Sequence, residues 1–127
     1  MGRFVIRAVP TGVKFDLYAQ NGQTVLSSEV YLTVSACRKG LLSVRRNAAA
    51  AAVEDQTGSI PIRQKNPKFE LYTDKSGSFR FRLKAKNGQI IAVSEPYTTK
   101  AGCLGGIDSV RDNTAQAQIE EALVKTL

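Results

Sequence analysis

The sequence predicts an α+β domain built of two tandem repeats, each with three short strands followed by one helix. The first observation is an internal match. Residues 15–47 align without a gap with residues 81–113, and about half of the aligned positions are identical. The second is the strict alternation of apolar and charged residues in FRFRLKAK (79–86), which is typical of a strand with one buried face. The third is an Asn-Gly pair after each alternating segment, a strong hairpin signal. Chance is a poor explanation for this self-similarity, so we treat the segments as repeats.

Length and composition predict a single domain. The chain has 127 residues, of which 43% are hydrophobic and 23% charged, values that suit one soluble domain with its own core. We expect residues 1–127 to form it, with repeat one at about 3–56, a connector at 57–67 and repeat two at 68–123. No apolar run is long enough for a membrane span or a secretory signal.

Each repeat is expected to contain three strands, the last two joined by a tight hairpin. Asn87-Gly88 and Asn21-Gly22 suit a type I′ turn, in which both central residues have positive φ. With Lys86 opposite Gln89, the register follows. It pairs Leu83 with Ala92 on the core face, Arg82 with Val93 and Arg80 with Glu95 on the opposite face, and Lys14 with Glu29 in repeat one.

A helix follows the third strand in each repeat. Thr33 and Thr99 are good N-cap residues, and apolar residues recur behind them at helical spacing. Asn47 and Asn113 stand where a left-handed residue would close each helix.

Two features of the helical segments need tertiary structure to explain them. Gly40 and Gly106 lower helix propensity, so we expect them to pack closely against a sheet or the other helix. Residues 49–52 and 118–121 are ambiguous by propensity, because each could extend a helix or form a short strand.

The matched signature FRFRLKAKNGQIIAVSEPYTTKAG, followed by GIDSVRDN, resembles the repeat of the YegP-like family of small uncharacterised proteins. The resemblance covers nearly the whole chain. It implies β-β-β-α-β units that share a single antiparallel sheet, exchange their C-terminal strands and lay both helices on one face. It also implies short strands at Ala51–Asp55 and Gln118–Glu121, and it brings no established activity. Repeat one departs most, with Asp16, Tyr18 and Gln20 in place of Arg82, Lys84 and Lys86.

The sharpest candidate site is a row of cations on one face of a strand. The chain carries a net charge of +7, a surplus that favours anionic partners in general. Our hypothesis is a small basic binding module that contacts an acidic partner or nucleic acid through the open sheet face. A solvated strand face without a ligand is the simpler interpretation, and no stacking aromatic side chain stands in the row itself. The contact residues would be Arg80, Arg82, Lys84 and Lys86, with Lys14 in repeat one.

A protein–protein adaptor that uses sheet edges or the helix layer is the alternative function. We expect no enzyme, because histidine is absent and Cys37 and Cys103 fall on the apolar side of their helices. The Ser-Glu-x-Tyr-x-Thr segments at 28–33 and 94–99 fit a strand-to-helix corner better than a catalytic cluster, with the tyrosine wedged under the helix. We expect no catalytic residue, cofactor or metal, and a monomeric cytoplasmic protein with internal pseudo-two-fold symmetry.

Overall fold

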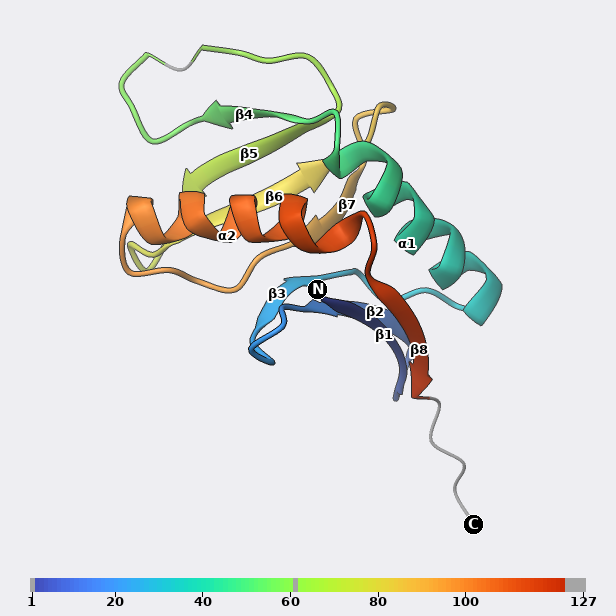
Figure 1. Cartoon of the computed structure of the whole chain (residues 1–127). Coiled ribbons are helices and arrows are strands. Elements are labelled where there is room, and N and C mark those ends of the chain that lie inside the picture. The colour runs from blue at the N-terminus through green and yellow to red at the C-terminus, as the bar shows by residue number, and fades with distance from the viewer. Residues whose placement is uncertain (1, 61, 123–127) are drawn as a thin grey trace.

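The computed structural model describes residues 2–60 and 62–122, which form one eight-stranded sheet and two helices (Figure 1). The predicted end of repeat two at residue 123 and residue 61 of the connector lie outside this range. The strands stand in the order β4-β5-β6-β7-β3-β2-β1-β8. Their bounds are β1 Arg3–Val9, β2 Gly12–Tyr18, β3 Thr24–Ser27, β4 Ala52–Asp55, β5 Lys68–Thr73, β6 Phe79–Lys84, β7 Ile90–Val93 and β8 Gln118–Ala122, and the helices are α1 Val34–Ala48 and α2 Lys100–Thr114.

The sheet is mixed, which corrects the expectation of a wholly antiparallel one. The six central strands are antiparallel, but β4 pairs with β5 and β8 pairs with β1 in parallel. Parallel neighbours cannot be joined by a tight turn and need a long connection. Residues 56–67 give the chain that length between β4 and β5. Short strands do follow both helices, at 52–55 and 118–122. Of the ambiguous residues 49–52, only Ala52 is part of a strand, and residues 49–50 form a turn after α1.

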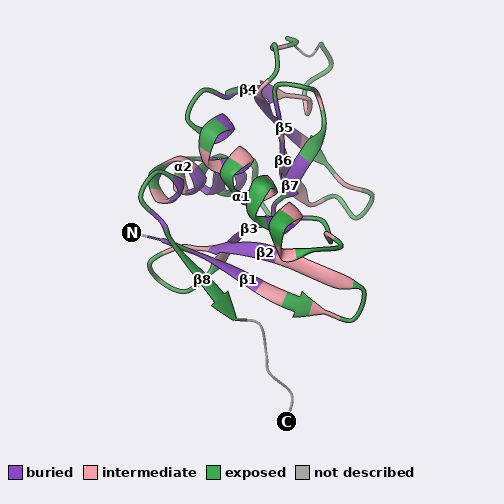
Figure 2. Ribbon diagram, turned by 90° about the vertical axis from the view of Figure 1, so that its right-hand side faces the viewer, coloured by how far each residue is buried: buried purple, intermediate pink, exposed green. Residues whose placement is uncertain are grey.

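Two four-stranded parts of the sheet meet at a narrow joint. β3 and β7 are paired only at Ser27 and Val93. Both helices lie on the concave side of the curved sheet, where α1 contacts β1, β2, β6 and β7 and α2 contacts β3, β5 and β6 (Figures 1 and 2). Since each helix touches strands on both sides of the joint, the helices hold the two parts of the sheet together.

The core between sheet and helices is built around four phenylalanines, Phe4, Phe15, Phe69 and Phe81, none of which is exposed. Phe4 and Phe15 meet edge to face with centroids 5.9 Å apart, and Phe69 and Phe81 do so at 5.8 Å. Edge-to-face packing is a favoured geometry for buried rings. The same ring arrangement thus occurs in both parts of the core.

The hairpin turns differ from the predicted type I′. Among the described residues only glycines have positive φ, with Gly22 at 86° and Gly88 at 85°. The Gly88 amide bonds the Ala85 carbonyl, and the Ala85 amide bonds the Gln89 carbonyl. The loop therefore has three residues and ends in a left-handed glycine bulge. Arg82 does pair with Val93 and Leu83 with Ala92, but the bulge shifts Lys84 to Ile90, so the register predicted next to the turn was wrong.

Both helices begin as predicted and end differently. The hydroxyls of Thr33 and Thr99 accept bonds from the amides of Ala36 and Gly102, so both threonines are N-caps. The expectation that Asn47 and Asn113 end the helices in a left-handed conformation was wrong, because both lie inside helices. Their amide groups instead donate to the carbonyl and hydroxyl of the serine one turn earlier, Ser43 or Ser109.

A tyrosine is wedged under each helix, opposite a glycine. Tyr31 stacks on Phe15 and Tyr97 on Phe81, each with centroids 6.4 Å apart. A Cβ atom on Gly106 would lie 2.7 Å from Tyr97 Cζ and 3.0 Å from Phe81 Cε2, and one on Gly40 would collide with the Tyr31 hydroxyl. The close approach expected of these glycines is therefore to the tyrosine rings.

An arginine near the end of each helix bonds the chain that leaves the other helix. Arg45 of α1 donates to the carbonyls of Thr114 and Ala117, between α2 and β8. Arg111 of α2 donates to the Ala51 carbonyl, between α1 and β4, over 2.6 Å. Each guanidinium also lies over a core ring, Arg45 over Phe4 at 5.7 Å and Arg111 over Phe69 at 5.3 Å. Arg45 and Arg111 occupy aligned positions in the two segments, but the sequence did not predict these contacts.

Two neighbouring glycines of α2 test the tyrosine wedge. We expect Gly106→Ala to lower the free energy of unfolding by about 1–3 kcal/mol, because its methyl group would push into packed rings. Gly105→Ala is the matched control. Its Cβ would meet nothing within 4 Å, so it should raise the free energy by up to about 1 kcal/mol through helix propensity. Urea denaturation measures both, and equal effects of the two changes would contradict the wedge.

Arg45→Lys tests the bonds between helix and departing chain. An ammonium group cannot span two carbonyls and also lie flat on a ring, so we expect a loss of about 1–3 kcal/mol in the free energy of unfolding. Arg46→Lys, at an exposed neighbour, should change it by less than about 0.5 kcal/mol. If the two substitutions are equally mild, Arg45 does not fix the chain as described.

Candidate anion-binding surface

The predicted cation row lies on the outer face of the sheet, the face turned away from the helices. Phe81 and Leu83 of β6 are fully buried on the helix side. Arg80, Arg82 and Lys84 alternate with them and are half-buried on the outer face, because side chains of a strand point to opposite faces in turn. The other two predicted contact residues, Lys86 in the exposed turn after β6 and half-buried Lys14 on β2, make no ion pair with any residue described.

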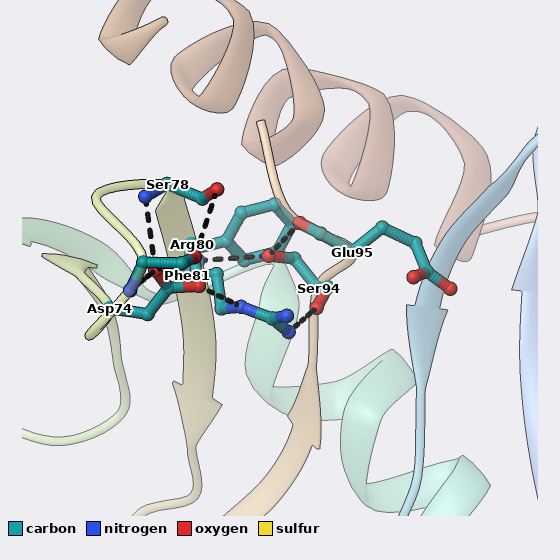
Figure 3. Close-up of polar contacts among 7 residues, drawn as sticks. Asp74, Ser78, Arg80, Phe81, Ser94 and Glu95 are labelled. Atoms are coloured by element: carbon teal, nitrogen blue, oxygen red, sulfur yellow. Dashed lines mark hydrogen bonds and ion pairs between the residues drawn. The ribbon is translucent and has the colours of Figure 1, made fainter. Parts of the chain in front are cut away.

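The sequence predicted that Arg80 pairs with Glu95, but in the structure Arg80 pairs with Asp74 instead. Its Nε donates to Asp74 over 2.7 Å, and its Nη1 donates to the Ser94 carbonyl at 3.3 Å. Figure 3 shows the Glu95 carboxylate pointing away from this group. Asp74 lies in the turn before β6, where its other bonds to Ser76 and Ser78 hold it beside Arg80. The bond to Arg80 is the main reason that the pKa of Asp74 falls to about 2.

Arg82 and Lys84 share one buried carboxylate. Glu70 of β5 is only 3% exposed. It bonds Arg82 over 2.7 Å and lies 3.3 Å from both Lys84 and Lys68. Burial alone would raise the pKa of Glu70, but the cations outweigh it and leave the pKa lowered. These cations therefore compensate a charge of the protein's own.

A second buried carboxylate ties the connector to the sheet. Glu54 of β4 bonds Lys68 Nζ over 2.8 Å, the Gln64 amide over 2.6 Å and the Gln56 side chain over 2.7 Å. The bond to Lys68 is the main cause that lowers the pKa of Glu54 to about 2. Because Gln56 directly precedes the connector and Gln64 belongs to it, ionised Glu54 holds that segment against β4.

The outer face also carries tyrosines, one of which was missed. The Arg82 guanidinium lies 4.5 Å from the ring centre of Tyr72, and Arg3 lies 5.2 Å from that of Tyr18. Period-two alternation in KFELYT places Tyr72 on the same face as Lys68 and Glu70, so the sequence contained the signal. The row lacks its own aromatic residue, but the strand beside it supplies one.

The groups that resemble catalytic residues are occupied in structural roles. Ser94 Oγ accepts from the Phe81 amide and donates to the Glu95 carbonyl, and Ser28 does the same with Phe15 and Glu29. Cys37 and Cys103 are fully buried as predicted. Burial raises the pKa of both thiols to about 11, so neither is a ready nucleophile near pH 7. No helix among the described residues is long and apolar enough to cross a membrane.

The pKa of Glu54 gives a test of the connector contact. A carboxylate with a depressed folded-state pKa stabilises the fold fully above its unfolded value near 4.5, and this stabilisation is lost as the pH falls towards 2. We expect the difference in the free energy of unfolding between the wild type and Glu54→Gln to shrink by about 2 kcal/mol from pH 7 to pH 3. Exposed Glu29→Gln should show no such change. A pH-independent difference for Glu54→Gln would refute the assignment.

The chain is similar in sequence to a known protein family and to several of its members. Residues 12–55 and 74–121 match the domain of unknown function DUF1508. The UPF0339 protein YegP of Escherichia coli is 33% identical over 108 residues, which cover 85% of this chain and 84% of YegP. A UPF0339 protein of Treponema denticola is 63% identical over 54 residues, which are 42% of this chain but 93% of that protein.

Solved structures share the fold. The solution structure of YegP from E. coli superposes with a TM-score of 0.79 at 30% identity, covering 98% of this chain and 96% of YegP. That of SO3888 from Shewanella oneidensis gives 0.77 at 28% identity, covering 96% and 92%. By sequence and by structure, this chain belongs to the uncharacterised DUF1508 family of UPF0339 proteins, the YegP-like family that its repeat signature resembles.

Proposed function

We propose that this protein is a small non-enzymatic binding module that holds an acidic partner on the outer face of its sheet. Single-stranded nucleic acid is the partner class that the face suits best. Lys84, Lys86 and Lys14 would make the electrostatic contacts, with Arg80 and Arg82 beside them. The free cysteines are in keeping with a protein of the reducing cytoplasm, where we place this activity.

The observation that carries the proposal is the surplus of positive charge on this face. Around Glu70, the three cations Lys68, Arg82 and Lys84 meet only two carboxylates, the second being Glu54. Lys86 and Lys14 add two cations that have no carboxylate partner among the residues described. Positive charge that the protein does not neutralise itself is available to release counterions from a polyanion.

The stacked pair of Arg82 and Tyr72 supports nucleic acid over other polyanions. The guanidinium carbon of Arg82 lies over the Tyr72 ring, 4.5 Å from its centre, and such a cation and ring are groups on which a base can stack. The exposed apolar side chains of Ile90 and Val93, on neighbouring β7, would add apolar contact. Heparin, which has no bases, would gain nothing from these groups.

We also infer that the two matched segments are true repeats that exchange their last strands within a monomer. The T. denticola relative matches over nearly all its length but less than half of this chain, as a single repeat would. β4 follows α1 yet pairs with β5, and β8 follows α2 yet pairs with β1. A tandem chain makes this pairing intramolecular and thus independent of protein concentration.

A protein–protein adaptor remains the second candidate because of three exposed aliphatic side chains. Leu32 is 88% exposed, Ile60 85% and Ile62 76%. Ile60 and Ile62 lie in the connector beside the edge strand β4, and sheet edges can take up another strand. A complex with a protein whose affinity does not change with salt would favour this role.

The salt dependence of RNA binding tests the first proposal. We expect the full chain to bind a 5′-labelled 20-nucleotide oligouridine, followed by fluorescence anisotropy, with an affinity that falls steeply from about 50 to 200 mM salt. In the variant Lys84→Gln/Lys86→Gln, the slope of log K against log salt should become shallower by roughly 1.4, about 0.7 for each lost phosphate contact.

The control variant is Lys39→Gln/Lys75→Gln, which removes the same charge from an α1 residue and from the β5–β6 turn. It should keep the wild-type slope. Equal slopes for the two variants would show binding through net charge alone. Failure to bind oligouridine, single-stranded DNA and heparin at about 50 mM salt would overturn the proposal.

A further inference from the structure

A second surface, which shares only Lys86 with the predicted cation row, combines a hollow with unpaired cations. A pocket of about 590 Å³ lies between the last turn of α1, the start of β5 and the turn after β6. This volume is within the range of small-molecule sites. Arg46 and Lys86 line it, neither makes an ion pair within the described part of the chain, and no carboxylate is among the lining residues. The pocket is therefore positively charged.

A side chain with an unused hydrogen-bond acceptor also lines this pocket. Asn47 is only 8% exposed, and its Nδ2 donates to the carbonyl and hydroxyl of Ser43. Its Oδ1 accepts no hydrogen bond from a described residue. Since no side-chain polar atom in that part of the chain is both sealed from solvent and unpartnered, Oδ1 is accessible, and Asn47 is one of the residues that line the pocket. An acceptor in this position suits a ligand with an N–H or O–H donor.

The other half of the chain contains a corresponding hollow without this chemistry. Ser109, Ala19 and Asn21 line it, and they match Ser43, Ala85 and Asn87 of the first. In the aligned sequence, however, Asp112 stands in place of Arg46 and Gln20 in place of Lys86. The backbone of Gly2 lies against the corresponding Asn113, since a Cβ there would lie 2.9 Å from Asn113 Oδ1. If the fold itself required cations beside such a hollow, both halves of the chain would carry them. Folding therefore does not explain why only the first hollow has Arg46 and Lys86.

We propose that the pocket binds a small anionic molecule that also carries a hydrogen-bond donor. Its carboxylate or phosphate group would lie between Arg46 and Lys86, and its donor would meet Asn47 Oδ1. The carbonyl end of α1 carries partial negative charge, which favours a donor there and directs the anionic group to the two side chains. Ala50, Pro67 and Ala85 provide an apolar wall for a compact ring. This site does not depend on nucleic-acid binding by the outer face.

Orotate tests the combination because it joins a carboxylate to a planar ring with N–H donors. We expect a ¹H–¹⁵N titration of the full chain to shift the amides of residues 46–50 and 85–87. Uracil keeps the ring but has no carboxylate, and benzoate keeps the carboxylate but has no ring N–H. Each should bind at least tenfold more weakly. Uridine monophosphate, run in parallel with uridine, decides whether a phosphate serves better than a carboxylate.

Three variants locate the site. Arg46→Gln should weaken orotate binding at least tenfold, whereas Asp112→Asn, at the position that aligns with Arg46, and Lys84→Gln on the outer face should leave it unchanged. The spectrum of each variant reports whether the fold is intact. Equal binding of uracil and orotate, unchanged binding by Arg46→Gln, or no shift with orotate and uridine monophosphate at about 10 mM would each overturn the proposal. Because Lys86 belongs to both proposed sites, Lys84→Gln, which removes a cation of the outer face alone, separates a loss of RNA binding from a loss of orotate binding.

Discussion

Arg45 and Arg111 fix the path of the chain at the two places where it leaves a helix for a distant sheet edge. β4 and β8 are short strands of four and five residues, and neither is joined to its neighbour by a tight turn. Such strands gain little from their own hydrogen bonds until the chain before them is ordered. A guanidinium that bonds the carbonyls of that chain and packs on a core ring supplies this order. Each arginine lies on one helix and serves the other, so the helices and both edges become interdependent.

Ion pairs extend the same arrangement to the edge strands. Arg38 of α1 pairs with Glu121 of β8, and Lys100 of α2 pairs with Asp55 of β4. Glu121 and Asp55 lie beyond the aligned segments but match when the same offset is continued, although their partners come from different helical turns. Exposed pairs contribute modestly to stability. Both pairs lie on the edge strands β4 and β8, which follow the segments bonded by Arg111 and Arg45. The two edge strands of the sheet therefore both depend on contacts with the helices.

The sequence predicted best the features that local chemistry decides. A threonine before an apolar period of 3.6 is enough to identify Thr33 and Thr99 as caps, and alternation is enough to separate the two faces of β6. Local chemistry did not determine the type of hairpin turn, because Asn-Gly suits both a two-residue type I′ turn and a three-residue loop in which only the glycine is left-handed. Arg80 could reach either Glu95 or Asp74, and the serines that anchor Asp74 decided between them. The parallel edges arise from contacts between residues far apart in the chain, which no local pattern specifies.

Comparison of matching positions separates scaffold from surface. Positions that agree between the two segments hold the tyrosine wedge, the arginine contacts, the caps and the asparagines bonded to serines. Each of these is accounted for by packing or hydrogen bonds. The positions that differ include two at which one segment has a carboxylate and the other has a cation. They are Asp16, which aligns with Arg82, and Asp112, which aligns with Arg46. Buried Asp16 binds Arg7 and Ser27, so the first half holds a paired carboxylate where the second half holds Arg82. The second half places its surplus cations at β6 and the turn beyond it, next to Arg46. A fold with two similar halves thus differs between them in its charged side chains, and the anion binding that we propose would use mainly the cations of the second half.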